Sequence, residues 1–203
     1  NLPAEKTQPV KRLFPQEKPG VEKAFTSFSM PVSMPIFGLG FKEKPPVGDT
    51  TKTEVVCDML TEMICGETSA LYRRLYDEGL VQPGFAGEYG SFDECLYFLF
   101  TGESADPERV RGELLAEIRR QRKDGIDKAQ FETCKNMMYG AAIADLESFE
   151  RVAALLSSSY FRGRTPAQEL EAIAAVEYED VQQALETMLL EENCATVVVM
   201  PTE

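Results

Sequence analysis

Hydrophobic residues recur at helical spacing in one early stretch and over most of the second half of the chain. After Thr51, apolar side chains follow one another three or four residues apart and predict one buried helix face: Val55, Val56, Met59, Leu60, Met63 and Ile64. Thr51 and Glu54 have the spacing of a capping box, and Gly66 is expected to end this helix in the left-handed conformation. A shorter helix is predicted to begin after Ser69, its candidate cap, and to stop at Gly79.

Five short stretches of apolar or alternating residues predict β-strands. They are 21–30, 36–41, 84–92, 95–101 and 195–200. Pro31 and Pro35 interrupt the end of the first stretch, so we expect that strand at an edge of the sheet or beside a bulge. The last stretch is rich in Val and Thr, and we expect it in the interior of the sheet.

Capping signals divide the second half of the chain into several helices. A capping residue followed by proline marks two helix starts, at Asp106 and at Thr165. Asp127 is expected to cap another helix, and the apolar pattern after it is too long for one globular helix. We therefore predict a kink or break near Glu147, and a last helix over about 178–190.

The order of these elements predicts an α+β fold. Two strands, two helices, two strands, several helices and a closing strand fit an antiparallel (mixed) sheet with helices packed on one face, a sandwich. Residues 21–203 are expected to form a single domain, because the last strand needs a sheet and the only sheet lies early in the chain. Residues 1–20 are rich in Pro, Lys and Gln and are expected to be a linker or arm. The first residue is Asn, and we expect a piece of a longer chain.

Composition narrows the class of partner. The formal net charge of −13, from 34 acidic and 21 basic residues, would repel a phosphate backbone, so no nucleic-acid partner is expected. No run approaches the roughly 18 apolar residues of a membrane span, so no membrane partner is expected either. The five cysteines are scattered without a CxxC pair, which favours buried thiols in a reducing cytoplasm over disulfides or a zinc site.

Histidine is absent from the sequence. A Ser-His-Asp triad, a Cys-His pair and an HxxEH zinc site are therefore excluded, and we expect neither a catalytic residue nor a metal ligand here. An independent enzyme that uses carboxylates or a thiol has no motif to support it. The neighbouring Asp77 and Glu78 point apart on a helix, as ordinary surface carboxylates do.

Candidate substrate-binding residues gather around the second predicted helix. Tyr76, Phe85 and Tyr89 offer aromatic contact area for a peptide, and packing in the core or at an interface explains them equally well. Arg73 and Arg74 lie near the end of that helix. Solvated side chains favoured by the helix dipole are the preferred interpretation of the two arginines, and a substrate carboxylate is the alternative.

The order of elements, with Ala-Leu-Tyr-x-x-Leu-Tyr-Asp-Glu-Gly-Leu at 70–80 before a Gly- and Phe-rich strand, resembles the insulinase- or pitrilysin-type zinc metallopeptidases. This family includes the mitochondrial processing peptidase. Residues 174–184, followed by a Val-rich strand, are similar to the usual ending of a domain in that family. The resemblance covers about 21–201. Family members pair an N-terminal half that carries HxxEH with a similar C-terminal half that has lost it, and this chain looks like the second half.

The resemblance implies a non-catalytic half of a zinc peptidase. It would enclose peptide substrate and position it against the N-terminal half or a paired subunit, which would hold the zinc. The alternative is an inactive scaffold or binding protein of the same fold. Many members use an Arg and a Tyr seven positions later, but these positions fall on Tyr76 and Pro83, so the pair is not carried over. Glu177 stands where the family usually has a Ser or Thr helix cap.

Overall fold

The described strands form one mixed sheet in the order β1-β5-β2-β4-β3. The computed structural model describes residues 13, 20–44, 50–92 and 95–202. The strands are β1 (Phe25–Met30), β2 (Ile36–Glu43), β3 (Ala86–Phe92), β4 (Cys95–Glu103) and β5 (Cys194–Pro201). β1 runs parallel to β5, and the other neighbours are antiparallel. The predicted α+β fold is confirmed, as are the edge position of the first strand and the interior position of the last.

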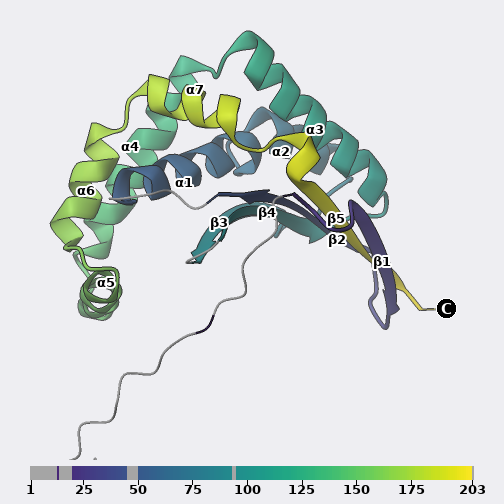
Figure 1. The fold of residues 1–203 in the computed structure, drawn as a ribbon, viewed down its shortest axis with the longest axis horizontal. Coiled ribbons are helices and arrows are strands. Elements are labelled where there is room, and N and C mark those ends of the chain that lie inside the picture. Colours follow the sequence, from purple (N-terminus) through teal and green to yellow (C-terminus); the bar gives the residue numbers. More distant parts are fainter. Residues whose placement is uncertain (1–12, 14–19, 45–49, 93–94, 203) are drawn as a thin grey trace, which may run out of the picture.

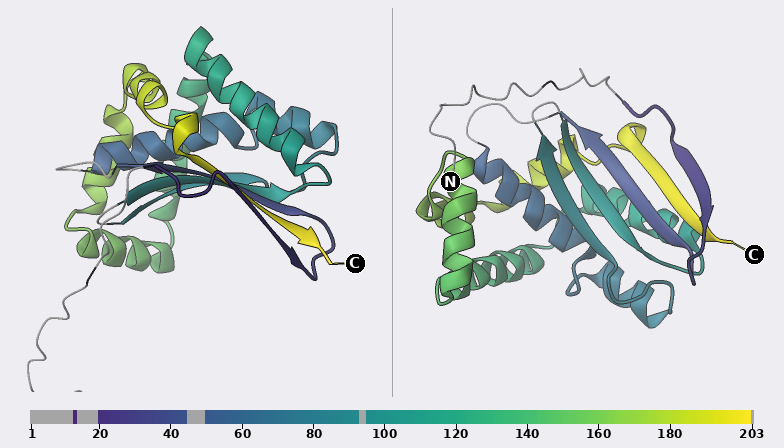
Figure 2. Two further views of the ribbon diagram at one scale, coloured as in Figure 1. Left: turned by 45° about the vertical axis from the view of Figure 1, so that its right-hand side comes forward. Right: turned by 90° about the horizontal axis from the view of Figure 1, so that it is seen from below.

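Helices cover one face of this sheet and leave the other uncovered (Figure 1). They are α1 (Thr51–Cys65), α2 (Ala70–Asp77), α3 (Pro107–Asp124), α4 (Lys128–Asp145), α5 (Phe149–Phe161), α6 (Pro166–Ala175) and α7 (Tyr178–Thr187). α5 is the exception, because it lies below the level of the sheet, on the uncovered side (Figures 1 and 2). The arm predicted over 1–20 falls almost entirely outside the described residues.

Local capping chemistry sets most of the helix boundaries. Four of the predicted cap residues accept a hydrogen bond from the backbone N–H three residues later: Ser69, Asp106, Asp127 and Thr165. Such a bond satisfies one of the donors that a helix start leaves without a partner. The break predicted near Glu147 is confirmed, since α4 ends at Asp145 and α5 begins at Phe149.

The capping box predicted at the start of α1 is wrong. The residue before the helix is Thr50, and its hydroxyl donates to the Glu54 carboxylate at 2.7 Å instead of capping a backbone N–H. Gly66 does end α1, but its φ of −60° and ψ of 158° are extended rather than left-handed. A Cβ on Gly66 would lie 2.1 Å from Oε1 of Glu62, so this position needs glycine for space and not for handedness.

The last helix is shorter than predicted. α7 ends at Thr187, and Leu189 has a φ of 60°, which no helix can continue. The carboxylate of Glu43 accepts a hydrogen bond from the Leu189 N–H at 2.8 Å, and burial raises the pKa of Glu43. Arg122 donates to the carbonyls of Leu185 and Met188 and ties the same turn to α3. These bonds hold a conformation that is unfavourable for leucine.

The core lies between the sheet and α1. Phe37, Leu39 and Phe41 alternate along β2 toward the helices and are buried, as are the corresponding residues of β4. All six residues of the apolar face predicted for α1 are buried in the same core. The intervening residues of β2 and β4 point to the uncovered side.

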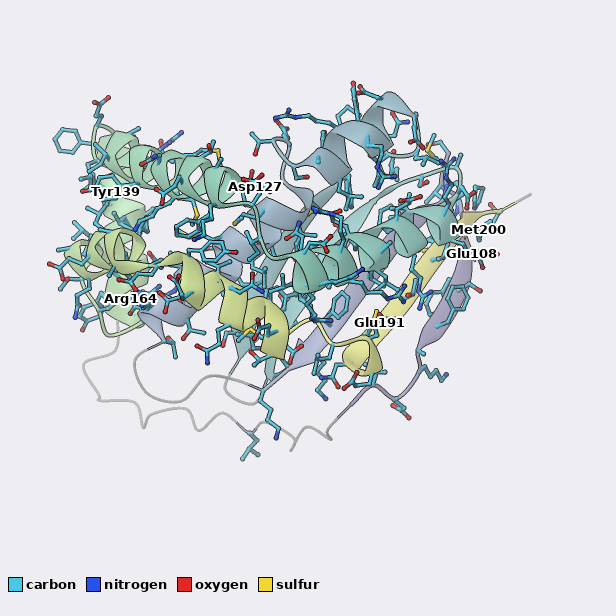
Figure 3. All side chains as sticks on the ribbon, turned by 90° about the horizontal axis from the view of Figure 1, so that it is seen from above. Glu108, Asp127, Tyr139, Arg164, Glu191 and Met200 are labelled. Carbon is cyan, nitrogen blue, oxygen red and sulfur yellow. The ribbon has the colours of Figure 1, made fainter. Side chains whose placement is uncertain are left out.

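An ion-pair cluster fixes the turn between α5 and α6 to α1. The Arg164 side chain is only 9% exposed and donates to Glu54 on α1 and to Glu169 on α6, each at 2.8 Å. Figure 3 shows Arg164 at the end of the helical layer that lies away from the Met200 end of the sheet. This cluster joins three helices and so sets where α5 leaves the body of the domain.

Candidate functional site

An aromatic stack connects the surface to the core beside the end of α2. The rings of Tyr76 and Tyr72 stack with their centroids 6.0 Å apart, and Tyr72 stacks on Phe85 at 6.1 Å. Phe85 in turn contacts Phe37 of β2 at 5.9 Å. Tyr76 is 48% exposed, whereas Phe85 is 3% exposed, so Tyr76 is the end of the stack that a ligand can reach.

The two predicted arginines lie on the exposed side of α2, and they differ in their partners. Arg74 donates to Glu113 of α3 at 2.7 Å, which holds its guanidinium against the neighbouring helix. Arg73 is exposed, and within the described residues its side chain has neither a hydrogen bond nor an ion pair. Arg73 is therefore the more available of the two to an anionic group of a ligand.

Tyr89 lies apart from this stack, farther along β3. It pairs with Phe98 across the sheet and points to the helix side, where burial and the carboxylates of Asp58 and Glu54 raise its pKa. Asp58 is exposed to solvent, yet surrounding protein atoms desolvate its carboxylate and, with Glu54 nearby, raise its pKa to about 6. The ring of Tyr89 thus belongs to the junction of α1 and β3.

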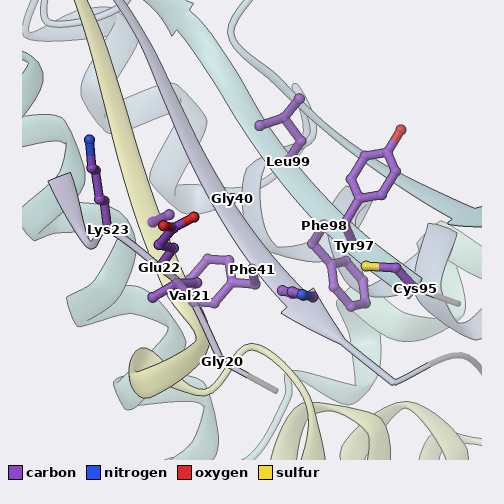
Figure 4. Close-up of a pocket in the computed structure, with 12 residues that line it drawn as sticks. Gly20, Val21, Glu22, Lys23, Gly40, Phe41, Cys95, Tyr97, Phe98 and Leu99 are labelled. Carbon is purple, nitrogen blue, oxygen red and sulfur yellow. The ribbon is translucent and has the colours of Figure 1, made fainter. Parts of the chain in front are cut away.

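The uncovered face of the sheet carries a cavity of about 410 Å³. Its floor includes Gly40 of β2, Ala195 of β5, and Tyr97 and Leu99 of β4. Residues 20–23 lie along one side of it, across Gly40 from Tyr97 and Leu99 (Figure 4). The glycine leaves room above the sheet, and the lining suits an apolar side chain.

Sequence reasoning missed two parts of this region. Tyr72 links Tyr76 to Phe85, but a stack between a helix and a later strand depends on tertiary packing and leaves no sequence pattern. The apolar residues of the uncovered face did leave a signal, because Tyr97 and Leu99 make β4 apolar on both sides. A strand that is apolar on both sides indicates that other protein groups pack on both faces of the sheet.

The described residues do not fit a zinc ion. Among them, no group of three Cys, Asp or Glu side chains is placed to hold a metal, and the sequence has no histidine. The thiols are also poor nucleophiles, since burial raises the pKa of Cys57, Cys65 and Cys134 to about 12 and that of Cys194 to about 11. None of the five cysteines is in a disulfide. The side chains of this region can therefore bind and orient a ligand, and they offer no metal chemistry.

The sequence profile of the Peptidase M16 inactive domain matches residues 1–138. The chain belongs to this family. The resemblance to insulinase-type peptidases, and to their non-catalytic domain, is confirmed. Within the described residues, no helix of this M16 inactive domain is long and apolar enough to cross a membrane.

Relatives of this M16 inactive domain include proteins named as zinc proteases. The Uncharacterized zinc protease YmfH of Bacillus subtilis (strain 168) is 20% identical over 195 residues, which are 95% of this chain and 45% of YmfH. An M16-like peptidase from Alicyclobacillus acidocaldarius has a similar fold, with a TM-score of 0.85 and 24% identity, over 94% of this chain and 46% of that one. A protease from Helicobacter pylori gives a TM-score of 0.81 and 17% identity, over 97% and 48%. The chain thus spans less than half the length of each.

Proposed function

We propose that this domain is the C-terminal, non-catalytic half of a zinc peptidase and that it encloses and positions unfolded peptide. The zinc ion and its HxxEH motif would belong to an N-terminal half, in the same chain or in a paired subunit. The relatives named as zinc proteases and the inactive-domain family support this assignment. The compartment we propose is the cytoplasm, because none of the five cysteines is in a disulfide.

The observation that carries the proposal is the uncovered, apolar face of the sheet. Phe28 and Met30 of β1 and Val197 of β5 are exposed, and they lie on the same face as the cavity beside Gly40. An extended apolar surface is rare on a single chain that has no partner. A peptide held over this face would be bound by apolar contact, with no bond-breaking group of this domain near it.

The role of such a half is positioning. Holding the scissile bond of a peptide in the right place relative to the cleaving group of the other half would accelerate cleavage by making the encounter effectively intramolecular. On α2, Tyr76 and Arg73 are the candidate contacts to the peptide, because Arg74 is paired with Glu113. Phe85 would act through Tyr72 by supporting the ring of Tyr76, and Tyr89 would support the junction with α1.

A reconstitution experiment tests the proposal. The N-terminal half of the parent protein and this domain are produced separately, and cleavage of a fluorogenic peptide is measured for each alone and for the mixture. We expect activity in the mixture to exceed that of the N-terminal half alone by at least tenfold, and this domain alone to be inactive. No gain on mixing, or stoichiometric zinc bound by this domain alone, would argue against the positioning role.

The second candidate function is an inactive scaffold of the same fold. The observation that favours it is the missing Arg and Tyr pair, since Tyr76 and Pro83 stand at those positions. Reading the rest of the parent gene separates the two functions. An HxxEH motif with a downstream Glu favours the peptidase, and its absence favours the scaffold.

A further inference from the structure

Eight large apolar side chains are exposed on α4, between α4 and α5, and on α5, and six of them recur at helical spacing. We call these six the α4–α5 apolar surface: Tyr139, Ile143, Leu146, Phe149, Leu156 and Tyr160. Phe149 is 97% exposed and Tyr160 79% exposed. Figure 3 shows Tyr139 at the outer end of α4, far from the Met200 end of the sheet. Exposed apolar groups gathered in this way mark a surface that binds another protein surface.

The spacing of these residues gives each helix one apolar face. On α5, Phe149, Leu156 and Tyr160 are seven and eleven residues apart, which places them within roughly 40° of one another around a helix with 3.6 residues per turn. The three members on α4 and its end follow one another at intervals of four and three residues. A face of this kind is the pattern of a helix that packs against another element.

The rest of the described chain gives α5 little support. Ser159 is the one buried residue of this 13-residue helix, and α6 is the element against which α5 mainly packs. A helix of this length is only marginally stable in water without tertiary contacts. A protein surface that covers the apolar face of α5 would supply the packing contacts that the described chain does not.

The chemistry of the surface selects its occupant. Its side chains offer apolar contact area, and the exposed ion pair between Arg151 and Asp145 lies among them, as at the polar rim of a protein interface. Its match is an apolar protein surface. More than half of YmfH and of the Alicyclobacillus acidocaldarius peptidase has no counterpart in this chain, which leaves room for a second body of similar size.

We propose that the α4–α5 apolar surface is the docking site for the metal-bearing half of the parent peptidase. This inference rests on the proposed function, which supplies that half. α5 lies on the uncovered side of the sheet in both views, and Arg164 fixes its end to α1 (Figures 1 and 2). A body seated on α5 would therefore lie on the uncovered side of the sheet, where the proposed function places the peptide.

The test measures association of the two separately produced halves by isothermal titration calorimetry. The Leu156→Glu/Tyr160→Glu double variant is expected to raise the Kd at least 100-fold, because each charge would be buried against an apolar surface. Ala116→Glu, at an exposed position of α3, adds one negative charge elsewhere, where the double variant adds two, and is expected to change the Kd less than twofold. Both altered residues of the double variant are exposed, so its circular dichroism spectrum and its thermal midpoint should match those of the parent sequence.

The outcomes separate the docking site from the positioning role on which it rests. An unchanged Kd for the double variant overturns the docking site, as does a failure of the unaltered halves to associate. An unchanged Kd with a raised KM for peptide would assign the surface to substrate and overturn the inference. Halves that associate through this surface without gaining peptidase activity would uphold the docking site and contradict the positioning role.

Discussion

The carboxylate of Glu62 fills the space beside Gly66 at the end of α1. Even one added methyl group at position 66 would therefore clash. We predict that Gly66→Ala lowers the free energy of unfolding by about 1–3 kcal/mol, because the added methyl group overlaps both the carboxylate and the carbonyl of Glu62. Urea denaturation followed by circular dichroism measures this change. Gly112→Ala is the control, since nothing lies within 4 Å of its new methyl group in the middle of α3, and it should stabilise by about 0.5–1 kcal/mol. A Gly66→Ala variant as stable as the parent would contradict the steric argument.

Asp58 should make stability depend on pH. Its pKa of about 6 in the folded chain lies above the ordinary value of 3.8, so the folded state binds the proton more tightly than the unfolded state does. The free energy of unfolding therefore falls, through this group, as the pH rises from about 4 to about 6. We predict that Asp58→Asn is more stable than the parent at pH 7 and that the difference disappears below pH 4. Because water reaches this carboxylate, the effect should be small.

Urea denaturation at several pH values measures the effect of Asp58→Asn. Asp77→Asn removes one charge from an exposed position on α2 and serves as the control. A parent protein whose stability advantage over Asp58→Asn grows with pH would contradict the direction of the pKa shift.

The turn between α5 and α6 depends on one arginine. Arg164 is nearly buried between two glutamates, and its loss would leave Glu54 and Glu169 with an uncompensated charge. We predict that Arg164→Met lowers the free energy of unfolding by about 3 kcal/mol, as the breaking of a buried ion pair does. Arg162→Met is the matched control, because Arg162 is exposed and lies 3.4 Å from the same Glu54, and it should change stability by less than about 0.5 kcal/mol. Equal effects of the two substitutions in urea denaturation would contradict the role given to Arg164.

Elements whose boundaries depend on neighbours in sequence could be predicted. Four helices are capped through a hydrogen bond that spans three residues, by Ser69, Asp106, Asp127 and Thr165. Such a cap can be predicted from the local sequence alone. The start of α1 was predicted wrongly for the opposite reason. Glu54 is drawn to Arg164, which is far along the chain, and no local rule reveals that competition.

At the scale of the whole molecule, the fold class, the edge position of β1 and the interior position of β5 could be predicted, and the full order of the strands could not. Alternation along each strand predicts which residues are buried, but strand order depends on pairings between distant segments. The candidate site divides in the same way. Tyr76 and Arg73 could be named as candidates because their helix is recognisable in the sequence. The stack through Tyr72 forms only when α2 packs beside Phe85, and the cavity beside Gly40 only when β2, β4 and β5 come together.

The position of β5 also has a consequence for how the protein is made. β1 and β2 are close in sequence, but β5 lies between them and is the sole partner of β1 among the described strands. A ribosome synthesises β5 after every other described element, so β1 must wait for it with unpaired backbone groups and exposed phenylalanines. Such an edge invites association with other nascent chains. We therefore expect the first strand of this domain to need protection by a chaperone until β5 has been made.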